Sequence, residues 1–498
     1  MKVSRFRYFT CRNVDKPSLV LISELTSSIS SNIDENRRKK KKLLFILSVT
    51  IIIIVILTII IVAFHFNLVN MIIGQMPQQQ QQKKKHDPSL QIPYNSLKVE
   101  LVTEGLSFPT SMEFIDNNNI LVLQKNTGTV HLVSNGIIQK KPLLKVQVDT
   151  NGERGLLGIT HSGKDVFLYF TESDYSDKPL RNRVYRYHWN GTDLVNRTLI
   201  LDLPAAPGPY HQGGKLKIGY DNYLYAVIGD LTAADGVLQN HKDGKKPNDS
   251  SVILRVNPDN GSPVNNNPFY SSNNYSSSSI NNNNSDYYND KDDVGSLLGR
   301  YYAYGIRNSF GMDFDPITGA LWDTENGEIG YDEVNLIKPG FNSGWAQVMG
   351  PIARNNNKTD NDLVSFPGSI YADPVFSWKA QIGVTDLEFL NSSKLGDKYT
   401  NNIFVGDINN GNLYYFEVND RRTGLKFDND NNDNNKNNKS SSNRHYVGLN
   451  DFVADNDDEL SALIFGTGFG RITDIETGPD GFLYILSYED GKIYRIVR

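Results

Sequence analysis

The sequence has almost no cysteine: Cys11 is the single one among 498 residues. One cysteine cannot form a disulfide within the chain, so the folded part must be held together by its hydrophobic core. The signatures of several enzyme classes are also missing, namely GxSxG, HExxH, CxxC and the phosphate-binding P-loop. A formal net charge of −5, with no basic stripe beyond the lysines and arginines that flank one apolar run, argues against a nucleic-acid partner.

That long apolar run, LLFILSVTIIIIVILTIIIVAFHF, occupies residues 43–66. It exceeds the roughly 20 residues that a helix needs to cross a bilayer, so it predicts one transmembrane helix. A cleaved signal sequence is the alternative, but the run lies far from Met1 and no small-residue cleavage site follows it. Residues 37–42 are all basic and directly precede the run. The positive-inside rule therefore predicts a single-pass type II membrane protein with a cytoplasmic N-terminus and a lumenal or extracellular C-terminal part.

Composition divides the chain into a cytoplasmic tail (1–42), the membrane helix (43–66), a polar stalk (67–95) and a large domain (96–498). Two tracts rich in Asn and Ser within the domain, 271–293 and 428–443, cannot bury apolar area and are expected to be disordered insertions. Eight Asn-x-Ser/Thr sequons lie on the predicted lumenal or extracellular side and indicate a glycoprotein: Asn190, Asn196, Asn248, Asn274, Asn283, Asn357, Asn391 and Asn438.

The large domain repeats one pattern, an alternating apolar run, a turn and a second alternating run. Period-two alternation rich in Val, Ile, Tyr and Phe predicts strands, and turns such as NTG, NNG and EDG predict hairpins. Six such units begin near residues 119, 165, 222, 320, 402 and 482, and long helices are absent from the pattern. Repeated antiparallel units of this size are typical of β-propellers. We therefore expect an all-β fold, a six-bladed β-propeller preceded by a single N-terminal transmembrane helix.

In a propeller, loops at one end of the blades converge on the central axis, so residues far apart in sequence can build one pocket. Four loop motifs are candidates: NGERGLLGI (151–159), YHQGGKLKIG (210–219), YAYGIRNSFGMDFDP (302–316) and WDTENGEIGYDEVNLI (322–337). A histidine at position 211 suits the role of a general base near neutral pH, or it is a packed structural histidine. Arg307 and Asn308 offer donors to a carbonyl or anion, or form an ion pair and a turn. The acidic fourth loop suits calcium, although it does not follow the EF-hand pattern.

Taken in order, these motifs, GFNSGW (340–345) after the fourth of them, and RITDIETGPDGFLY (471–484) resemble the glucose/sorbosone dehydrogenase family of soluble quinoproteins, over roughly residues 98–497. The resemblance implies oxidation of a sugar or alcohol by hydride transfer to pyrroloquinoline quinone, with His211 as general base. It implies that Arg307 and Asn308 contact the quinone oxygens, with Arg307 also stabilising charge in the reaction. It further implies that Arg471 binds the cofactor carboxylates, and that the backbone carbonyls of Gly327 and Glu328 hold a calcium ion.

The chain departs from the family pattern at four positions around the implied cofactor. Thr473 stands where a second arginine is common, and Asn409 stands near an expected lysine. Glu153 replaces an uncharged side chain beside the cofactor, and Glu328 replaces a proline. Together these changes remove positive charge and add negative charge near a ligand that carries three carboxylates. They predict weaker cofactor binding unless other cations compensate.

Two other functions remain open from the sequence. A non-catalytic propeller, similar to the hedgehog-interacting proteins, would bind a protein or glycan partner through its surface and have an axial pocket filled by side chains. A hydrolase would bring carboxylates such as Glu325 or Asp332 to the axis. A dehydrogenase instead requires His211 and Arg307 to face one axial pocket, with the Gly327 carbonyl beside it.

Overall fold

The computed structural model describes residues 90–94, 96–173, 179–270, 297–427 and 448–498. The predicted tail, the membrane helix, most of the stalk (67–89) and the two predicted insertions lie outside these ranges. Within them, no helix is long and apolar enough to cross a membrane. Gln91, near the end of the predicted stalk, pairs with Thr467. The folded domain therefore begins before residue 96.

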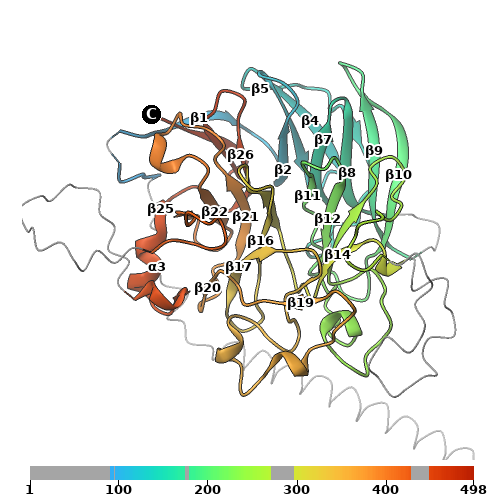
Figure 1. Ribbon diagram of the computed structural model, residues 1–498. Coiled ribbons are helices and arrows are strands. Elements are labelled where there is room, and N and C mark those ends of the chain that lie inside the picture. Colours follow the sequence, from blue (N-terminus) through green and yellow to red (C-terminus); the bar gives the residue numbers. More distant parts are fainter. Residues whose placement is uncertain (1–89, 95, 174–178, 271–296, 428–447) are drawn as a thin grey trace, which may run out of the picture. The chain divides into compact units, whose positions relative to one another are not determined.

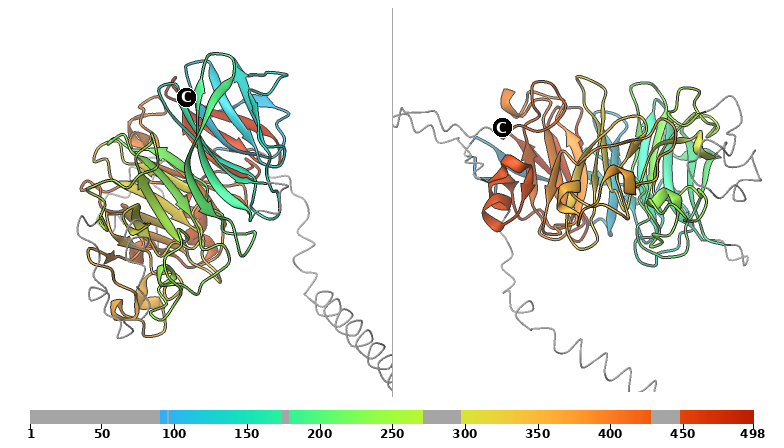
Figure 2. Two further views of the ribbon diagram at one scale, coloured as in Figure 1. Left: turned by 90° about the vertical axis from the view of Figure 1, so that its right-hand side faces the viewer. Right: turned by 60° about the horizontal axis from the view of Figure 1, so that its bottom comes forward.

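The described strands form six sheets, which stand side by side in Figure 1 and are seen from two further sides in Figure 2. The first sheet contains β2 (Pro109–Phe114), β3 (Asn119–Gln124), β4 (Thr129–Ser134), β5 (Ile137–Ile138) and β6 (Leu144–Lys145). The second contains β7 (Leu156–Ser162), β8 (Asp165–Glu172), β9 (Arg181–Trp189) and β10 (Leu194–Pro204). The third contains β11 (Leu216–Ile218), β12 (Leu224–Ile228), β13 (Val252–Val256), β14 (Tyr301–Tyr304), β18 (Phe341–Asn342) and β19 (Ile370–Tyr371).

The C-terminal half of the domain supplies the other three sheets. The fourth contains β15 (Gly311–Phe314), β16 (Leu321–Glu325), β17 (Asp332–Ile337), β20 (Phe376–Trp378) and β24 (Val453–Ala454). The fifth contains β21 (Val384–Phe389), β22 (Ile403–Asp407), β23 (Leu413–Phe416) and β25 (Ile464–Gly466). The sixth contains β26 (Ile472–Thr477), β27 (Leu483–Ser487), β28 (Lys492–Val497) and the N-terminal strand β1 (Lys98–Glu104).

The first strand of each sheet takes part in a closed ring. β2 contacts β7, β7 contacts β11, and the series continues through β15, β21 and β26 back to β2. The ends of the domain meet in the sixth sheet, where β1 pairs antiparallel with β28 from Lys98 opposite Val497 to Glu104 opposite Lys492. Figure 1 places the C-terminus beside β1 accordingly. The expected all-β, propeller-like fold is confirmed.

The alternating hairpin units lie where the sequence predicts them. They form the second and third strands of the six sheets: β3–β4, β8–β9, β12–β13, β16–β17, β22–β23 and β27–β28. The second strands are almost completely buried, because both of their faces pack against neighbouring sheets. Between the fourth and fifth sheets, for example, Trp322 and Trp378 belong to one fully buried cluster with Phe389. Burial on both faces explains why these runs are the strongest strand signals in the sequence.

Regular helix is scarce in the described residues. The α-helix α3 (Asp457–Leu463) begins at Asn456, whose side chain accepts hydrogen bonds from the amides of Asp458 and Glu459. Five single 3₁₀ turns are also described: η2 (Val237–Gln239), η5 (Ile352–Arg354), η6 (Asp360–Asp362), η7 (Asp397–Tyr399) and η8 (Leu449–Asp451). Leu297 and Leu298 are helical as well.

Candidate active site

A cavity of about 260 Å³ lies at one end of the ring of inner strands. All six sheets line it, through their first strand or the residues directly before that strand: Ser111, Leu157, Lys215, Phe310, Thr385 and Asp474. Its volume is near the lower end of the range for small-ligand pockets, roughly 300 to 1,000 Å³. The axial pocket is therefore open and not filled by side chains. A propeller that binds a ligand at its axis requires such an opening, whereas one that binds only through its surface does not.

The histidine loop runs along the edge of this cavity. After His211 the loop passes between packed segments that leave no room for a side chain at Gly213 or Gly214. A Cβ on Gly213 would lie 2.6 Å from the Val227 carbonyl oxygen, and one on Gly214 would lie 2.7 Å from the Leu157 side chain. His211 itself has a φ of +61°, in the left-handed region that non-glycine residues seldom adopt. The two glycines thus allow the close packing that fixes the position of His211.

Asp230, which lies two residues after the end of β12, orients the His211 ring. His211 Nδ1 lies 2.6 Å from Asp230 Oδ1, and the other carboxylate oxygen accepts a hydrogen bond from Trp345 Nε1 at 2.8 Å. Asp230 is only 2% exposed. This arrangement engages Nδ1 and leaves Nε2 as the ring nitrogen for a substrate proton, which is the geometry of an oriented general base.

Trp345 also connects the histidine to the predicted quinone contacts. The Arg307 guanidinium lies over the Trp345 ring at 5.2 Å from its centroid, and Arg307 NH1 donates to the Asn326 carbonyl at 2.9 Å. The backbone carbonyl of Arg307 accepts from the Asp230 amide. Asn308 is buried, and its Oδ1 has no hydrogen-bond partner among the described residues. A buried, unsatisfied amide oxygen is available to accept a hydrogen bond from a ligand or a water molecule.

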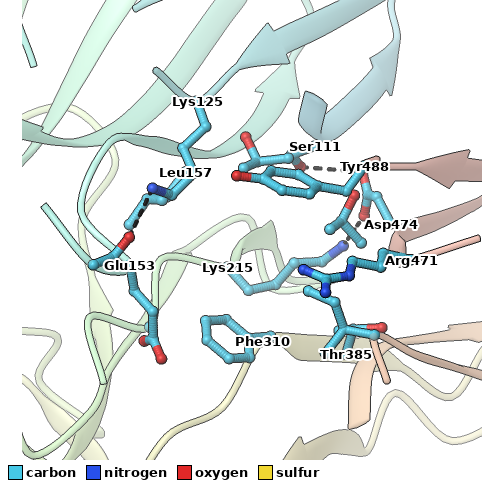
Figure 3. Close-up of a pocket in the computed structure, with 15 residues that line it drawn as sticks. Ser111, Lys125, Glu153, Leu157, Lys215, Phe310, Thr385, Arg471, Asp474 and Tyr488 are labelled. Atoms are coloured by element: carbon cyan, nitrogen blue, oxygen red, sulfur yellow. Dashed lines mark hydrogen bonds and ion pairs between the residues drawn. The ribbon is translucent and has the colours of Figure 1, made fainter. Parts of the chain in front are cut away.

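Glu153 joins the remaining predicted residues to this group. Its Oε2 accepts hydrogen bonds from the backbone amides of His211 at 2.7 Å and Gln212 at 3.3 Å, and Asn308 Nδ2 lies 3.3 Å from the same oxygen. Glu153 lines the cavity, and so does Arg471. The structure therefore brings His211, Glu153 and Asn308 into contact, while Arg471 approaches the cavity from the opposite side (Figure 3).

The two carbonyls expected to hold calcium have a different partner in the structure. The side chain of Gln381 donates through Nε2 to the Gly327 and Glu328 carbonyl oxygens, at 2.8 Å each. A calcium ion coordinated by both oxygens would have to displace this amide, so the residues present do not fit the ion as they stand. Among the described residues, no group of three or more His, Cys, Asp or Glu side chains could hold a metal ion. The calcium site stays a prediction that Gln381 argues against.

The carboxylates expected of a hydrolase are used within the fold. Asp332 accepts backbone hydrogen bonds from Gly327, Ile382 and Gly383. Glu325 accepts from the Arg307 amide and from Ser343 Oγ, both at 2.6 Å. Burial raises the pKa of Glu325 to about 7, against the opposing effect of these donors. Both side chains hold loops in place, and neither lines the cavity.

His211, Arg307 and Asn308 are not among the lining residues either, so the expectation that His211 and Arg307 face the axial pocket is not met directly. His211 and Asn308 reach the cavity through hydrogen bonds to the lining residue Glu153.

Charged residues pointing inward from the ring form the floor of the cavity. Lys215 Nζ lies 2.8 Å from Asp386 Oδ2 and 2.7 Å from Asp474 Oδ1, and all three side chains are buried. Burial lowers the pKa of Lys215, but the two carboxylates raise it more. Two residues further along β11, Lys217 lies 3.5 Å from Glu476. Residues two positions apart on a strand point to the same side, so the charged side chains of the inner strands form ion pairs with one another below the cavity.

Three residues of the site were not assigned from the sequence. Asp230 stands at the end of a predicted strand, nineteen residues after His211, and Trp345 closes the motif GFNSGW. A lone acid after a strand and a tryptophan after a glycine are common structural features, so neither pattern indicates a site by itself. Lys125, which lines the cavity from the turn after β3, gives no sequence signal at all.

Comparison with known proteins places this geometry in a family. The family model for glucose/sorbosone dehydrogenase matches residues 106–495. An aldose sugar dehydrogenase of Escherichia coli (strain K12) is 23% identical over 414 residues, covering 80% of this chain and 93% of the relative. Quinoprotein glucose dehydrogenase B of Acinetobacter calcoaceticus is 26% identical over 279 residues, covering 50% and 52%.

The fold agrees with solved structures as well. The PQQ-bound form of aldose sugar dehydrogenase from Streptomyces coelicolor superposes with a TM-score of 0.55 at 21% identity, covering 81% of this chain and 99% of that one. At this identity the likeness establishes the fold. Because the family model spans most of the chain, the protein belongs to the glucose/sorbosone dehydrogenase family.

Proposed function

We propose that this protein oxidises the C1 hydroxyl of an aldose, or a related alcohol, with pyrroloquinoline quinone as electron acceptor and His211 as general base. The observation that carries the proposal is the pair formed by His211 and Asp230. His211 is joined to an axial cavity lined by all six sheets through its backbone hydrogen bond to the lining residue Glu153. The family membership supports it, since the similar proteins named above include aldose and glucose dehydrogenases. We take the six sheets as the six blades of the propeller.

The residues of the chain supply the acid–base part of this reaction. With Nδ1 held by Asp230, the free Nε2 of His211 accepts the proton of the sugar hydroxyl, and the buried carboxylate stabilises the imidazolium that results. Trp345 keeps the Asp230 carboxylate in place by donating to its second oxygen. Arg307, held over the Trp345 ring, would supply positive charge to stabilise negative charge that develops on a bound acceptor.

The lining of the cavity offers groups that could hold a carboxylate-bearing quinone. Arg471 and Lys125 supply cations on its two sides. Asn308, which donates to the lining residue Glu153, has an unsatisfied buried oxygen. When bound there, the quinone would accept the hydride from the sugar C1 carbon. Arg307 and Asn308 would contact it, with Glu153 holding the Asn308 amide. No step is assigned to calcium, because Gln381 occupies the two carbonyls that would bind it.

The test is a turnover assay on the purified full-length protein. We expect reduction of an electron-accepting dye by at least one aldose, dependent on added quinone. The His211→Ala variant should lose turnover by about 10²-fold or more, as expected for removal of a general base. His188→Ala, which changes a histidine on the exposed side of β9, is the matched control. Absence of turnover in the intact protein across a panel of aldoses, or full activity of His211→Ala, would refute the proposal.

We also propose that the domain faces the lumen or the exterior, tethered by the predicted helix at 43–66. Exposed sequons support this orientation. Five of the eight sequon asparagines lie in the described residues, and all five are exposed: Asn190, Asn196, Asn248, Asn357 and Asn391. Treatment with a glycosidase specific for Asn-linked glycans should lower the apparent mass of the protein from its native source. An unchanged mass would count against the proposed orientation.

A further inference from the structure

Lys125 is a buried cation on the cavity wall that forms no ion pair with a carboxylate of the described residues. It directly follows β3, lines the cavity and is only 8% exposed. Its Nζ donates to the Gly152 carbonyl oxygen at 2.9 Å and to Asn126 Oδ1 at 3.4 Å, both neutral acceptors. A buried ammonium group without an ion-pair partner is unfavourable, and a nearby anion relieves that cost.

The other two cations of the cavity differ from Lys125 in this respect. Lys215 is neutralised by Asp386 and Asp474. Arg471 is 54% exposed and forms an ion pair with Glu489 at 3.2 Å. Burial lowers the pKa of Lys125, although the charges of Glu153 and Asp149 act in the opposite direction. Of these three cations, Lys125 therefore gains most from an anionic ligand.

The backbone around Lys125 fixes its side chain before any ligand binds. The Lys125 amide donates to the Phe108 carbonyl at 3.1 Å, and its carbonyl accepts from the Leu156 amide at 3.1 Å. Its stem lies so close to Gly155 that a Cβ there would be 2.5 Å from Lys125 Cγ. A cation held in this way loses little conformational entropy on binding a ligand, which favours affinity.

We propose that Lys125 is the anion anchor of the cavity and binds a carboxylate of the ligand on the side opposite Arg471 (Figure 3). It supplies a positive charge to a cavity in which Thr473 and Asn409 stand where basic residues are expected from the family pattern. Thr473 lines the cavity but uses its hydroxyl to donate to the Pro109 carbonyl. For the identity of the ligand, the inference rests on the proposed function. The role of Lys125 itself rests on the cavity and the contacts described.

A charge-exchange cycle on the full-length protein tests this role. Binding of pyrroloquinoline quinone and of its uncharged trimethyl ester is measured by calorimetry for the intact protein, Lys125→Met and Lys125→Arg. Lys140→Met, at an exposed lysine, is the matched control. We expect Lys125→Met to weaken binding of the acid on the order of 10- to 100-fold, as for loss of one member of a buried charge pair. Binding of the ester should be unchanged, and Lys125→Arg should restore most of the affinity for the acid.

Each outcome decides between the inference and the proposed function. Equal binding of the acid by the intact protein and Lys125→Met overturns the anchor role but leaves the proposed function standing. Equal losses for acid and ester also overturn it, because they indicate a structural effect. If the intact protein does not bind the quinone, the proposed cofactor is wrong, and pyridine-2,6-dicarboxylate becomes the probe. Binding of that rigid dicarboxylate that is lost in Lys125→Met supports the anchor, and absence of binding overturns it.

Discussion

His211 Nδ1 and Asp230 Oδ1 lie 2.6 Å apart, and Trp345 Nε1 donates to the remaining Asp230 oxygen at 2.8 Å. These residues come from the loop before β11, the end of β12 and the segment after β18. The contact sets the tautomer and direction of the histidine ring, so the activity should depend on a carboxylate that touches no substrate atom.

The first prediction concerns this pair. Asp230→Asn should lower kcat by about 10²- to 10⁴-fold with little change in KM for the sugar, because the ring loses its oriented and charge-stabilised state while the cavity keeps its shape. Steady-state kinetics check it, with the melting temperature as a control for folding. Retention of full kcat in Asp230→Asn would show that Asp230 does not position the base.

The second prediction concerns the cavity floor. Lys215→Met leaves Asp386 and Asp474 buried without their shared cation, and loss of one member of a buried pair costs about 3–5 kcal/mol. The free energy of unfolding should fall by about that amount in urea titrations at neutral pH. Lys140→Met, at an exposed position, should leave it nearly unchanged. A loss no larger than that of the control would contradict the ion-pair network described here.

The third prediction concerns pH. A hydrogen bond with Glu113 at 2.8 Å raises the pKa of His161, while burial opposes the shift and the charges of Glu113 and Glu476 add to it. A raised histidine pKa stabilises the fold fully below the unfolded-state value of about 6.5, and the stabilisation is lost as pH rises through the folded-state pKa. The melting temperature of the intact protein should therefore exceed that of His161→Asn most at acidic pH.

Melting curves of both proteins across a pH series measure this difference. His188→Asn changes a histidine of the same sheet whose side chain is 42% exposed, and it controls for the loss of an imidazole. A gap between the intact protein and His161→Asn that stays constant or widens with pH would mean that the bond to Glu113 does not favour the protonated ring.

The fourth prediction concerns metal. Gln381 satisfies the Gly327 and Glu328 carbonyls, so neither a chelator nor added calcium should change the melting temperature of the intact protein. Gln381→Glu places a carboxylate against the same oxygens and should cost about 1–3 kcal/mol from the lost donor. Calcium, which prefers oxygen ligands, should restore the melting temperature of that variant. Gln139→Glu, at an exposed glutamine, is the control. Calcium-dependent stability of the intact protein would show that the ion displaces Gln381.

Much of the scaffold could be predicted from the sequence because its signals are local. The second and third strands of each sheet are buried on both faces or alternate strongly, so their apolar periodicity identifies all six hairpins. The inner strands give weaker signals, since strands such as β11 and β26 are short or direct charged residues toward the axis. Charged residues alternate along these strands, as Lys215 and Lys217 do in one and Asp474 and Glu476 in the other. In the sequence alone, such alternation is typical of a strand face exposed to solvent.

For the candidate site, the motifs identified His211, Arg307, Asn308 and Glu153, and the structure joins them through direct contacts or through Trp345. No local sequence pattern shows which residue each of these side chains or carbonyls contacts. Asp230 at the His211 ring, Gln381 at the two carbonyls and Lys125 across the cavity from Arg471 come from different sheets or loops. The sequence alone determined which strands form and which loops carry chemistry, because burial and turn preferences act over a few residues. Only the closed ring decided which charges meet at its axis, because that depends on six sheets packing together.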